Sequence, residues 1–357
     1  MLAALDAAGY GMLAPVLPEI GQQTGTGPGV AGALVACFGL GQLVGYPIAG
    51  LMAQRRGAFW TLRASLVLLL VGDAIFVLGD GLAAWFPARG VQGLGAAGLW
   101  IGVSFAILEH WPDQAYQRVS GALAAYSAGA VLGPAMGAVH GIRGPFVAHA
   151  VFALAAFLPV LLLGAAQTRA RFGTDRTVLR TRAFAVSAAG IVLIALTVGT
   201  IDGPLPLHLS SGLGQTGIAA LYVVTAAVVA AGAMLAGRFR PTTALVIAAL
   251  LVPPGVGFVG ATGSVGPWVA GLAVAGLGFG LGESGALGIL LAAVSRERIV
   301  TAWVLLAQMW AAGYLVGPAV AGLVAQSVGY GVLGVVPLVG SLLVAYTLRS
   351  GSVGHSD

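Results

Sequence analysis

Three acidic residues, Asp6, Asp202 and Glu283, lie in stretches that are otherwise almost wholly apolar. A carboxylate near the centre of a membrane helix costs about 2.5–3.5 kcal/mol even on the lenient insertion scale, so such residues are rare and usually functional. The chain has only 11 acidic residues, and three of them at membrane depth are a large share. Carboxylates in this setting handle protons, ions or polar substrates, which predicts a transporter.

The composition points the same way. Hydrophobic residues make up 59% of the 357 residues and charged residues 8%, and the mean hydropathy is +0.98. A soluble domain is about 25% charged, so no soluble fold could cover its surface with this composition. The net charge of +5 comes from arginines at predicted helix ends, which are topology signals rather than a nucleic-acid surface. The single Cys37 excludes an internal disulfide, and no metal or cofactor site is expected.

At roughly 20 residues per span, the sequence predicts twelve membrane helices in two sets of six. The predicted spans are 2–22, 28–53, 61–79, 85–109, 119–140, 146–166, 184–208, 216–237, 242–261, 266–294, 301–325 and 331–348. We expect an N-terminal half 1–166, a cytoplasmic central loop 167–183, a C-terminal half 184–348 and a cytoplasmic tail 349–357.

The arginines predict the orientation. Nearly all of those in loops fall on one side, with five of them in the central loop. Only Arg143 lies in a loop of the other side, and Arg89 lies inside the fourth span near that side. By the positive-inside rule, both termini are predicted to be cytoplasmic.

The two halves repeat each other in sequence. Val91–Gly95 matches Val274–Gly278, and Gly129-x-x-x-Gly133-Pro134-x-x-Gly137 matches Gly313-x-x-x-Gly317-Pro318 at nearly the same separation along the chain. This organisation resembles the major facilitator superfamily, whose two six-helix halves are parallel repeats. The resemblance implies an all-α membrane protein that binds its substrate near the midplane and transports it by alternating access.

Three motifs strengthen the resemblance. Gly50, Arg55 and Gly57 are similar to the superfamily's loop signature after the second helix, with Gln54 where the family usually has Asp; an ordinary positive-inside loop is the alternative. Arg89-Gly90-Val91-Gln92-Gly93-Leu94-Gly95-Ala96-Ala97 resembles the R-x-x-Q-G-x-G-A-A motif of drug:proton antiporters, and a snorkelling arginine is the alternative. Gly129, Gly133, Pro134 and Gly137 look like the antiporter motif of the fifth helix, where small residues allow close helix packing.

The three acids extend the resemblance to vesicular monoamine transporters and bacterial multidrug efflux proteins. Asp6 precedes Pro15-Val16-Leu17-Pro18, Asp202 precedes Gly203-Pro204-Leu205-Pro206, and Glu283 lies in the tenth span. The resemblance implies that these acids bind a cationic substrate or carry coupled protons, with Arg89 biasing their protonation. The lysine which that family has in its second helix falls at about Phe38. For each acid, the alternative is a structural group satisfied by a neighbouring hydroxyl or by the backbone.

Further residues complete the predicted substrate site. Tyr10 lies one turn from Asp6, Gln92 belongs to the Arg89 motif, and Trp100 is the repeat equivalent of Glu283. Asp73 has no motif around it, so helix packing and a water-facing position are equally open. His140 and His149 are isolated and fit no metal site, so loop or core roles are expected.

We therefore expect a monomeric exporter in the cytoplasmic membrane that moves a hydrophobic, cationic small molecule against protons. The alternatives are a proton-coupled importer of the same fold and a non-transporting sensor or scaffold. No enzyme motif is found. Asp6 lies close to Met1, so we also expect that the first helix of the native protein begins upstream. The alternative is a shortened first helix with Asp6 close to the cytoplasmic mouth.

Overall fold

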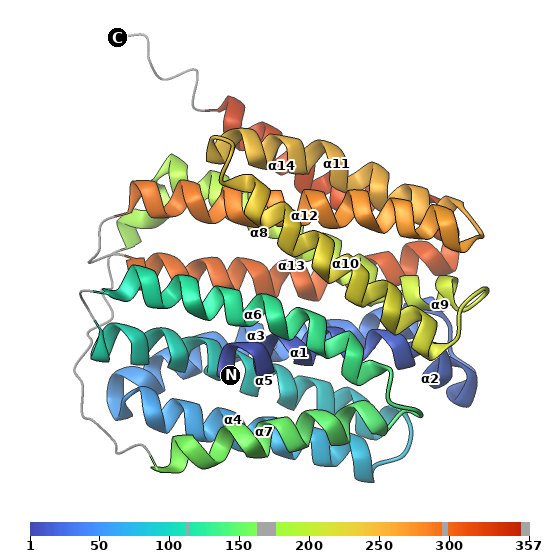
Figure 1. Cartoon of the computed structure of the whole chain (residues 1–357), viewed down its shortest axis with the longest axis horizontal. Helices are drawn as coiled ribbons and strands as arrows, with labels where there is room; N and C mark the ends of the chain where they lie inside the picture. The colour runs from blue at the N-terminus through green and yellow to red at the C-terminus, as the bar shows by residue number, and fades with distance from the viewer. Residues whose placement is uncertain (112–113, 163–175, 295–298, 351–357) are drawn as a thin grey trace. The chain divides into compact units, whose positions relative to one another are not determined.

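The computed structural model describes residues 1–111, 114–162, 176–294 and 299–350, and the regular elements in these ranges are all helices (Figure 1). Ten helices among the described residues are long and apolar enough to cross a membrane. The other two predicted spans are α6, of 23 residues, and a broken first helix that runs from Leu2 to Thr24. The prediction of an all-α protein with twelve spans is confirmed.

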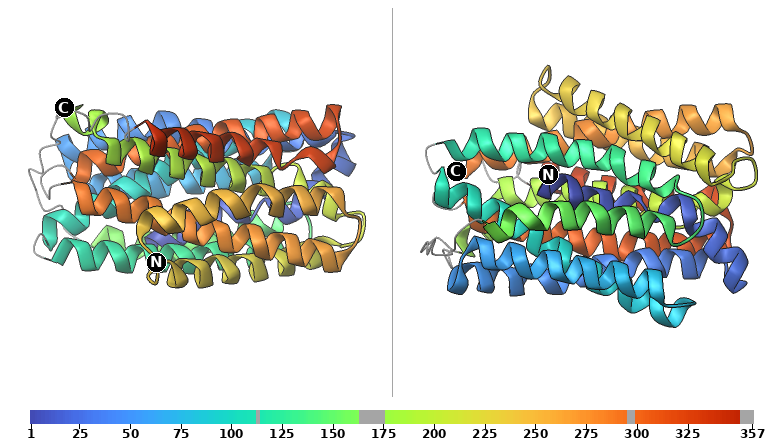
Figure 2. Two further views of the ribbon diagram at one scale, coloured as in Figure 1. Left: turned by 90° about the horizontal axis from the view of Figure 1, so that it is seen from above. Right: turned by 60° about the horizontal axis from the view of Figure 1, so that its bottom comes forward.

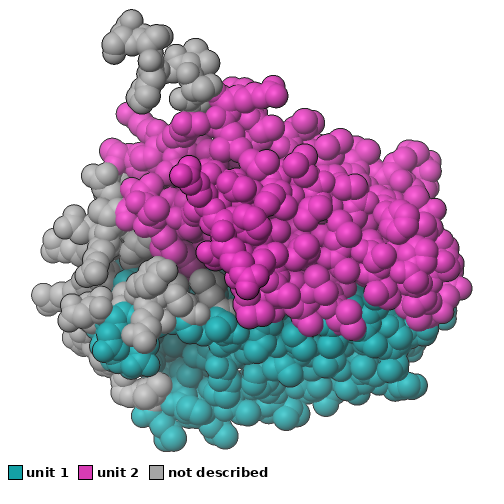
Figure 3. Space-filling model, turned by 45° about the horizontal axis from the view of Figure 1, so that its top comes forward, with its two compact units in different colours: residues 1–26, 37–172, 214–223 teal, residues 27–36, 173–213, 224–357 magenta. Residues whose placement is uncertain are grey.

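The chain divides into two compact units, coloured separately in Figure 3. Unit 1 comprises residues 1–26, 37–172 and 214–223, and unit 2 comprises 27–36, 173–213 and 224–357, so the division passes through two helices, α3 and α10. The predicted halves 1–166 and 184–348 remain a prediction. Of the predicted central loop, residues 167–175 lie outside the described residues, and so do residues 351–357 of the predicted tail.

Figures 1 and 2 colour the helices in chain order, from blue at the N-terminus to red at the C-terminus. The first six spans are α1 (Leu2–Gly11) with the 3₁₀ turn η1 (Ala14–Val16) and α2 (Leu17–Thr24), α3 (Pro28–Arg56), α4 (Ala58–Leu78), α5 (Leu82–His110), α6 (Ala115–Gly137) and α7 (Gly144–Leu162). After the short η3 (Arg176–Arg180) come α8 (Arg182–Asp202) with α9 (Leu205–Leu209), α10 (Gln215–Ala236), α11 (Pro241–Ala261), α12 (Val265–Ala293), α13 (Ile299–Ser327), and η4 (Tyr330–Val332) with α14 (Val335–Arg349).

The first and seventh spans are both broken, and at equivalent places. Leu17-Pro18 opens α2, and Leu205-Pro206 opens α9. A proline lacks the backbone N–H that a continuing helix needs, so each Leu-Pro pair starts a new helix instead of extending the old one. When the two Leu-Pro pairs are aligned, Asp202, the last residue of α8, is the equivalent of Ala14.

In unit 1, α6 packs tightly on α1 through the glycines of its motif. A Cβ added to Gly129 would lie 2.1 Å from the carbonyl oxygen of Ala4, and one added to Gly133 would lie 2.6 Å from that of Ala8. No side chain fits at either distance, so only glycine allows the two backbones to approach this closely.

In unit 2, α13 and α8 repeat this packing. A Cβ on Gly313 would lie 3.3 Å from the carbonyl oxygen of Val192, and one on Gly317 would lie 2.9 Å from that of Leu196. In the alignment of the two Leu-Pro pairs, Val192 and Leu196 are the equivalents of Ala4 and Ala8. The internal repeat is therefore a repeat of contacts as well as of sequence.

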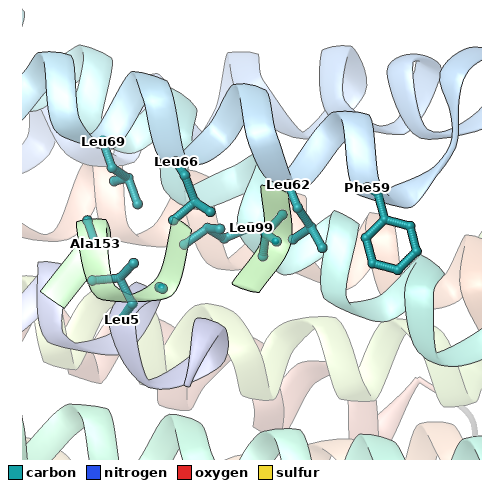
Figure 4. Close-up of a cluster of buried hydrophobic side chains, with 9 residues drawn as sticks. Leu5, Phe59, Leu62, Leu66, Leu69, Leu99 and Ala153 are labelled. Atoms are coloured by element: carbon teal, nitrogen blue, oxygen red, sulfur yellow. The ribbon is translucent and has the colours of Figure 1, made fainter. Parts of the chain in front are cut away.

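Apolar side chains hold the helices together inside each unit. In unit 1, Leu5 of α1 packs with residues of α4, α5 and α7, namely Phe59, Leu62, Leu66, Leu69, Leu99, Ala153, Ala156 and Val160 (Figure 4). Burying each large side chain of this kind stabilises the fold by about 1.5–3 kcal/mol in water, and packing density takes over that role in lipid. This cluster fixes α4 against α7, so polar residues of these two helices meet at a defined place.

Many large apolar side chains are exposed instead of buried. Leu162 is 87% exposed, Leu78 80% and Met234 77%. Water would penalise such a surface, whereas the hydrocarbon core of a bilayer solvates it. The exposed leucines, valines and phenylalanines thus mark the lipid-facing sides of the helices.

Candidate functional site

Asp6 is buried in the middle of α1, with 3% of its surface exposed. Its Oδ1 atom has no hydrogen-bond partner among the residues that the structure describes. A buried polar oxygen without a partner is costly, so it requires an explanation such as a bound proton or a ligand. Asp6 therefore has the property expected of a residue that holds something transiently.

Polar and aromatic side chains of unit 1 meet around Tyr10, one turn from Asp6. The Tyr10 hydroxyl accepts a hydrogen bond from Nε2 of Gln42, on α3. Tyr46, one turn further along α3, lies within interaction range of both the Tyr10 hydroxyl and the Asp6 carboxylate. The ring of Tyr10 also meets that of Phe38 edge-on at 4.8 Å between centroids. Tyr10 thus belongs to a built polar cluster and lies one turn from Asp6, as the sequence predicts.

Trp100 adds a further aromatic ring to this surface. It is half-buried on α5, and its ring meets Tyr126 of α6 edge-on at 5.6 Å. Tyr126 in turn lies 6.4 Å from Tyr10. Three rings from α1, α5 and α6 therefore form one series, and aromatic faces of this kind attract organic cations.

Arg89 is fully buried on α5. One of its terminal nitrogens donates to the carbonyl oxygen of Gly9 at 3.2 Å and to Oε1 of Gln92 at 2.8 Å. Its guanidinium carbon lies 4.4 Å from the centroid of Phe38, where the resembling family has lysine. An aromatic face stabilises a neighbouring cation, whereas a lysine would repel it.

Gln92 continues the series from Arg89 to two residues that the sequence did not place in a site. Its Nε2 donates to Oδ1 of Asp73 at 2.7 Å, and the other oxygen of Asp73 lies 2.8 Å from Nδ1 of His149. Nε2 of His149 lies 3.3 Å from the carbonyl oxygen of Leu5. Asp73 and His149 are both buried, on α4 and α7.

His149 lies in the core, which is one of the two positions expected for it, but it is hydrogen-bonded there to an acidic residue. The open choice for Asp73 resolves to a buried hydrogen-bonded position. The two residues lie far apart in the chain, on helices that are not consecutive, so no local pattern links them. The feature of the sequence that could have pointed to a polar site is that each is an ionisable residue in an apolar span. His140 lies instead in the loop after α6, on the wall of a surface pocket with Asp80 and Arg143.

In unit 2, Asp202 is buried at the end of α8, next to the helix break. The hydroxyl of Tyr314, on α13, donates to its Oδ2 at 3.2 Å. The Tyr314 ring is stacked on that of Trp310 with 8° between the planes. Asp202 is thus bound by a tyrosine of α13 whose ring is stacked on a neighbouring tryptophan.

Glu283 lies half-buried on α12. The neighbouring Gly280, Gly282 and Gly285 do not leave open space around it. A Cβ on Gly280 would lie 2.0 Å from the carbonyl oxygen of Val229, and Cβ atoms on Gly282 and Gly285 would meet neighbours at 2.8 and 2.7 Å. The glycines bring α12 close to neighbouring helices and leave Glu283 on the remaining face.

The predicted loop motif lies between α3 and α4. Arg55 is exposed in the last turn of α3, and Gly50 is buried one turn earlier in the helix. Gly57 has φ +88°, which favours glycine, and its carbonyl oxygen accepts a hydrogen bond from Thr61 at the start of α4. Gly57 thus allows the sharp turn between the two helices.

The structure therefore groups Asp6, Tyr10, Arg89, Gln92 and Trp100 in unit 1, with Asp202 and Glu283 in unit 2. A joint action of the acids of the two units remains a prediction.

The matches to known relatives are partial in length. The chain is 33% identical over 161 residues to Multidrug resistance protein 1 of Bacillus subtilis, covering 43% of this chain and 41% of that one. It is 28% identical over 159 residues to Quinolone resistance protein NorA of Staphylococcus aureus, with 43% and 41% covered. The chain thus spans about two fifths of the length of these relatives.

Solved structures share the fold over nearly the whole chain. A bacterial homologue of the human lysosomal transporter Spinster has a TM-score of 0.74 at 14% identity and covers 98% of this chain and 93% of its own. The human organic anion transporter MFSD10 has a TM-score of 0.72 at 17% identity, and the match covers 98% of this chain and 97% of that one. The D-xylose-proton symporter has a TM-score of 0.73 at 16% identity, and the match covers 96% of this chain and 95% of that one. Residues 1–302 match the Major Facilitator Superfamily. The chain is a multi-pass membrane protein and belongs to this superfamily.

Proposed function

We propose that the protein is a proton-coupled exporter of hydrophobic, cationic small molecules. The named relatives are a multidrug resistance and a quinolone resistance protein, and the Arg89 and Gly-Pro motifs resemble those of drug:proton antiporters. We further propose that it acts as a monomer in the cytoplasmic membrane, with both termini in the cytoplasm.

The observation that carries the proposal is the buried, unpartnered oxygen of Asp6. A carboxylate in this position binds either a proton or an organic cation, because either one neutralises the charge that burial makes costly. A protonated carboxyl group has lost the charge that attracts a cation, so Asp6 binds the proton and the cation in competition. This competition links outward movement of a cation to inward movement of a proton.

The aromatic series beside Asp6 fits the substrate class. Tyr10, Tyr126 and Trp100 offer ring faces and edges, which bind flat apolar cations without a fixed hydrogen-bond pattern. Such a surface tolerates different molecules of similar charge and hydrophobicity. Gln92 accepts a hydrogen bond from Arg89, so we assign it to orient this arginine at the edge of the proposed substrate site.

The acids of unit 2 complete the proposed cycle. Glu283 is half-buried and Asp202 keeps one tyrosine partner, so we assign proton exchange to Glu283 and cation binding to Asp202. The glycine packing of α6 on α1 and of α13 on α8 keeps each acid-bearing helix fixed to one neighbour, which suits rocking of rigid units. We propose that such rocking moves the turn between α3 and α4, at the predicted loop motif Gly50, Arg55 and Gly57.

The proposal is tested in everted membrane vesicles that are acidified inside. Addition of ethidium should collapse the pH gradient while ethidium accumulates within the vesicles. A proton-coupled importer would instead release ethidium together with protons, and a sensor or scaffold would leave the gradient unchanged. Vesicles without the protein give the background leak.

A further inference from the structure

His149 lies between a backbone carbonyl oxygen, which can only accept hydrogen bonds, and a carboxyl oxygen, which can only accept them while the carboxyl group is ionised. Its Nδ1 is 2.8 Å from Oδ2 of Asp73, and its Nε2 is 3.3 Å from the carbonyl oxygen of Leu5. Neutral imidazole has one N–H group and cannot donate to both. The observed arrangement is therefore satisfied only when the pair holds an additional proton.

That proton has two possible positions within the pair. Either His149 is an imidazolium beside an ionised Asp73, or a protonated Asp73 donates to Nδ1 while Nε2–H donates to Leu5. Both forms have no net charge. Each holds one proton more than a neutral imidazole beside a carboxylate, so release of that proton leaves the pair with a charge of −1.

We propose that Asp73 and His149 form a proton-binding site, separate from Asp6 and Glu283, whose proton fastens α1 to α7. On release, one of the two hydrogen bonds of His149 loses its hydrogen. The bond to Leu5 is the longer one and the Asp73 bond involves a charged group, so the Leu5 bond is lost. Because Leu5 precedes Asp6, proton loss then releases from α7 the segment of α1 that carries the proposed substrate acid.

The surroundings make such a release feasible. Arg89 reaches Asp73 through Gln92, so a positive charge lies near the pair when it becomes negative. The same arginine holds the carbonyl oxygen of Gly9, one turn beyond Leu5, and thus keeps α1 attached when His149 lets go. Asp73 and Arg63 are the ionisable side chains of α4, and Arg63 donates to the carbonyl oxygens of Val160 and Leu161 at the far end of α7. The other helices around α7 carry Arg89, Glu109 and His110 on α5, Asp6 and Tyr10 on α1 and, in the described part of α6, Arg118 and Tyr126.

The inference rests on the proton coupling proposed above, but its first test does not require transport. The five histidines are labelled with ¹⁵N in protein reconstituted in nanodiscs, and the His149 signals are assigned by their loss in His149→Gln. We expect a pH-dependent change in the His149 signals. At low pH both ring nitrogens are hydrogen-bonded, and at high pH His149 is the neutral tautomer that donates from Nδ1 to Asp73. Asp73→Asn should move the midpoint of this change. His208, whose Nε2 lies within hydrogen-bond distance of the carbonyls of Val259 and Thr262, should not respond to Asp73→Asn.

A His149 spectrum that stays constant over the whole pH range in which the protein is folded would overturn the proposal. So would a titration that Asp73→Asn leaves in place. Neither result would bear on whether the protein exports ethidium.

The second test separates coupling from binding. In His149→Gln, which keeps a donor and an acceptor but cannot titrate, ethidium accumulation driven by a pH gradient should be lost, while ethidium exchange across vesicles without a gradient remains. Unchanged accumulation would overturn the proton site, and loss of both activities in a folded protein would show a structural role and overturn it as well. If the wild-type protein shows no driven accumulation, the proposed function fails and the ¹⁵N titration alone decides the Asp73–His149 site.

Discussion

Pro134 of α6 packs directly against Gly11 of α1, where an added Cβ would meet its ring at 2.9 Å. In the other unit Pro318 of α13 packs in the same way against Gly199 of α8, with a corresponding distance of 2.3 Å. A proline inside a helix kinks it, and here each proline ring packs against a glycine that has no side chain to obstruct it. This pairing fixes the register of α1 and α8, which carry Asp6 and Asp202, on their neighbours.

The glycine packing on α1 can be tested by a single methyl group. Gly129→Ala should destabilise the protein by about 1–3 kcal/mol, because the new Cβ would overlap the Ala4 carbonyl. Gly121→Ala in the same helix is the matched control, since its Cβ would meet no atom within 4 Å. Thermal unfolding in detergent measures both. A Gly129→Ala protein as stable as the Gly121→Ala protein would contradict the packing.

Substitution of Asp6 should discriminate between substrates by charge. Asp6→Asn is expected to weaken transport of ethidium more than that of an uncharged phenanthridine of similar size, because carboxylate–cation attraction is stronger in a cavity of low dielectric constant. Initial rates in everted vesicles give the comparison. Asp80→Asn is the control, because Asp80 is exposed and pairs with Arg143. Equal losses for both compounds would indicate a structural role for Asp6.

Glu283→Gln should abolish export driven by a pH gradient and leave expression intact. Glutamine preserves the shape of the side chain on α12 but cannot exchange a proton. Vesicle accumulation at equal protein levels is the measurement, with Glu19→Gln, which changes the acid at the start of α2, as the control. Accumulation at the wild-type level would remove Glu283 from the coupling scheme.

Phe38→Lys should destabilise unit 1, although lysine is the residue that the resembling family has there. The ammonium would replace the ring that faces Arg89 at 4.4 Å and add a like charge in a buried site, which costs several kcal/mol. Phe38→Met, of similar volume and without charge, should be milder. The unfolding temperatures of the two variants decide, and a Phe38→Lys protein that is the more stable would refute the role of the ring.

Sequence reasoning located most of the fold because the bilayer imposes a simple rule. Apolar runs of suitable length predicted all twelve spans, and the Leu17-Pro18 and Leu205-Pro206 pairs lie where the first and seventh spans break, as expected of proline at a helix start. Motif spacing also placed Arg89 and Gln92 on one face of α5, where the structure has them bonded to each other.

The contact between Asp73 and His149 could not be predicted in this way. It depends on α4 packing beside α7, and that neighbourhood follows from the apolar cluster around Leu66 and Ala153 rather than from any local signal. The glycines near Glu283 show the same limit. Sequence shows that a residue is small, but only the neighbouring backbone shows whether the space is open or filled.

The shared register of the helix breaks has a consequence for the history of the chain. When the two Leu-Pro pairs are aligned, Asp6 corresponds to Ile194, and Asp202 corresponds to Ala14. The two aspartates are therefore not copies of one ancestral carboxylate. If the halves descend from a duplicated six-helix gene, the scaffold of glycines and prolines was retained in both copies while the acids diverged, so each half became specialised for a different share of the work.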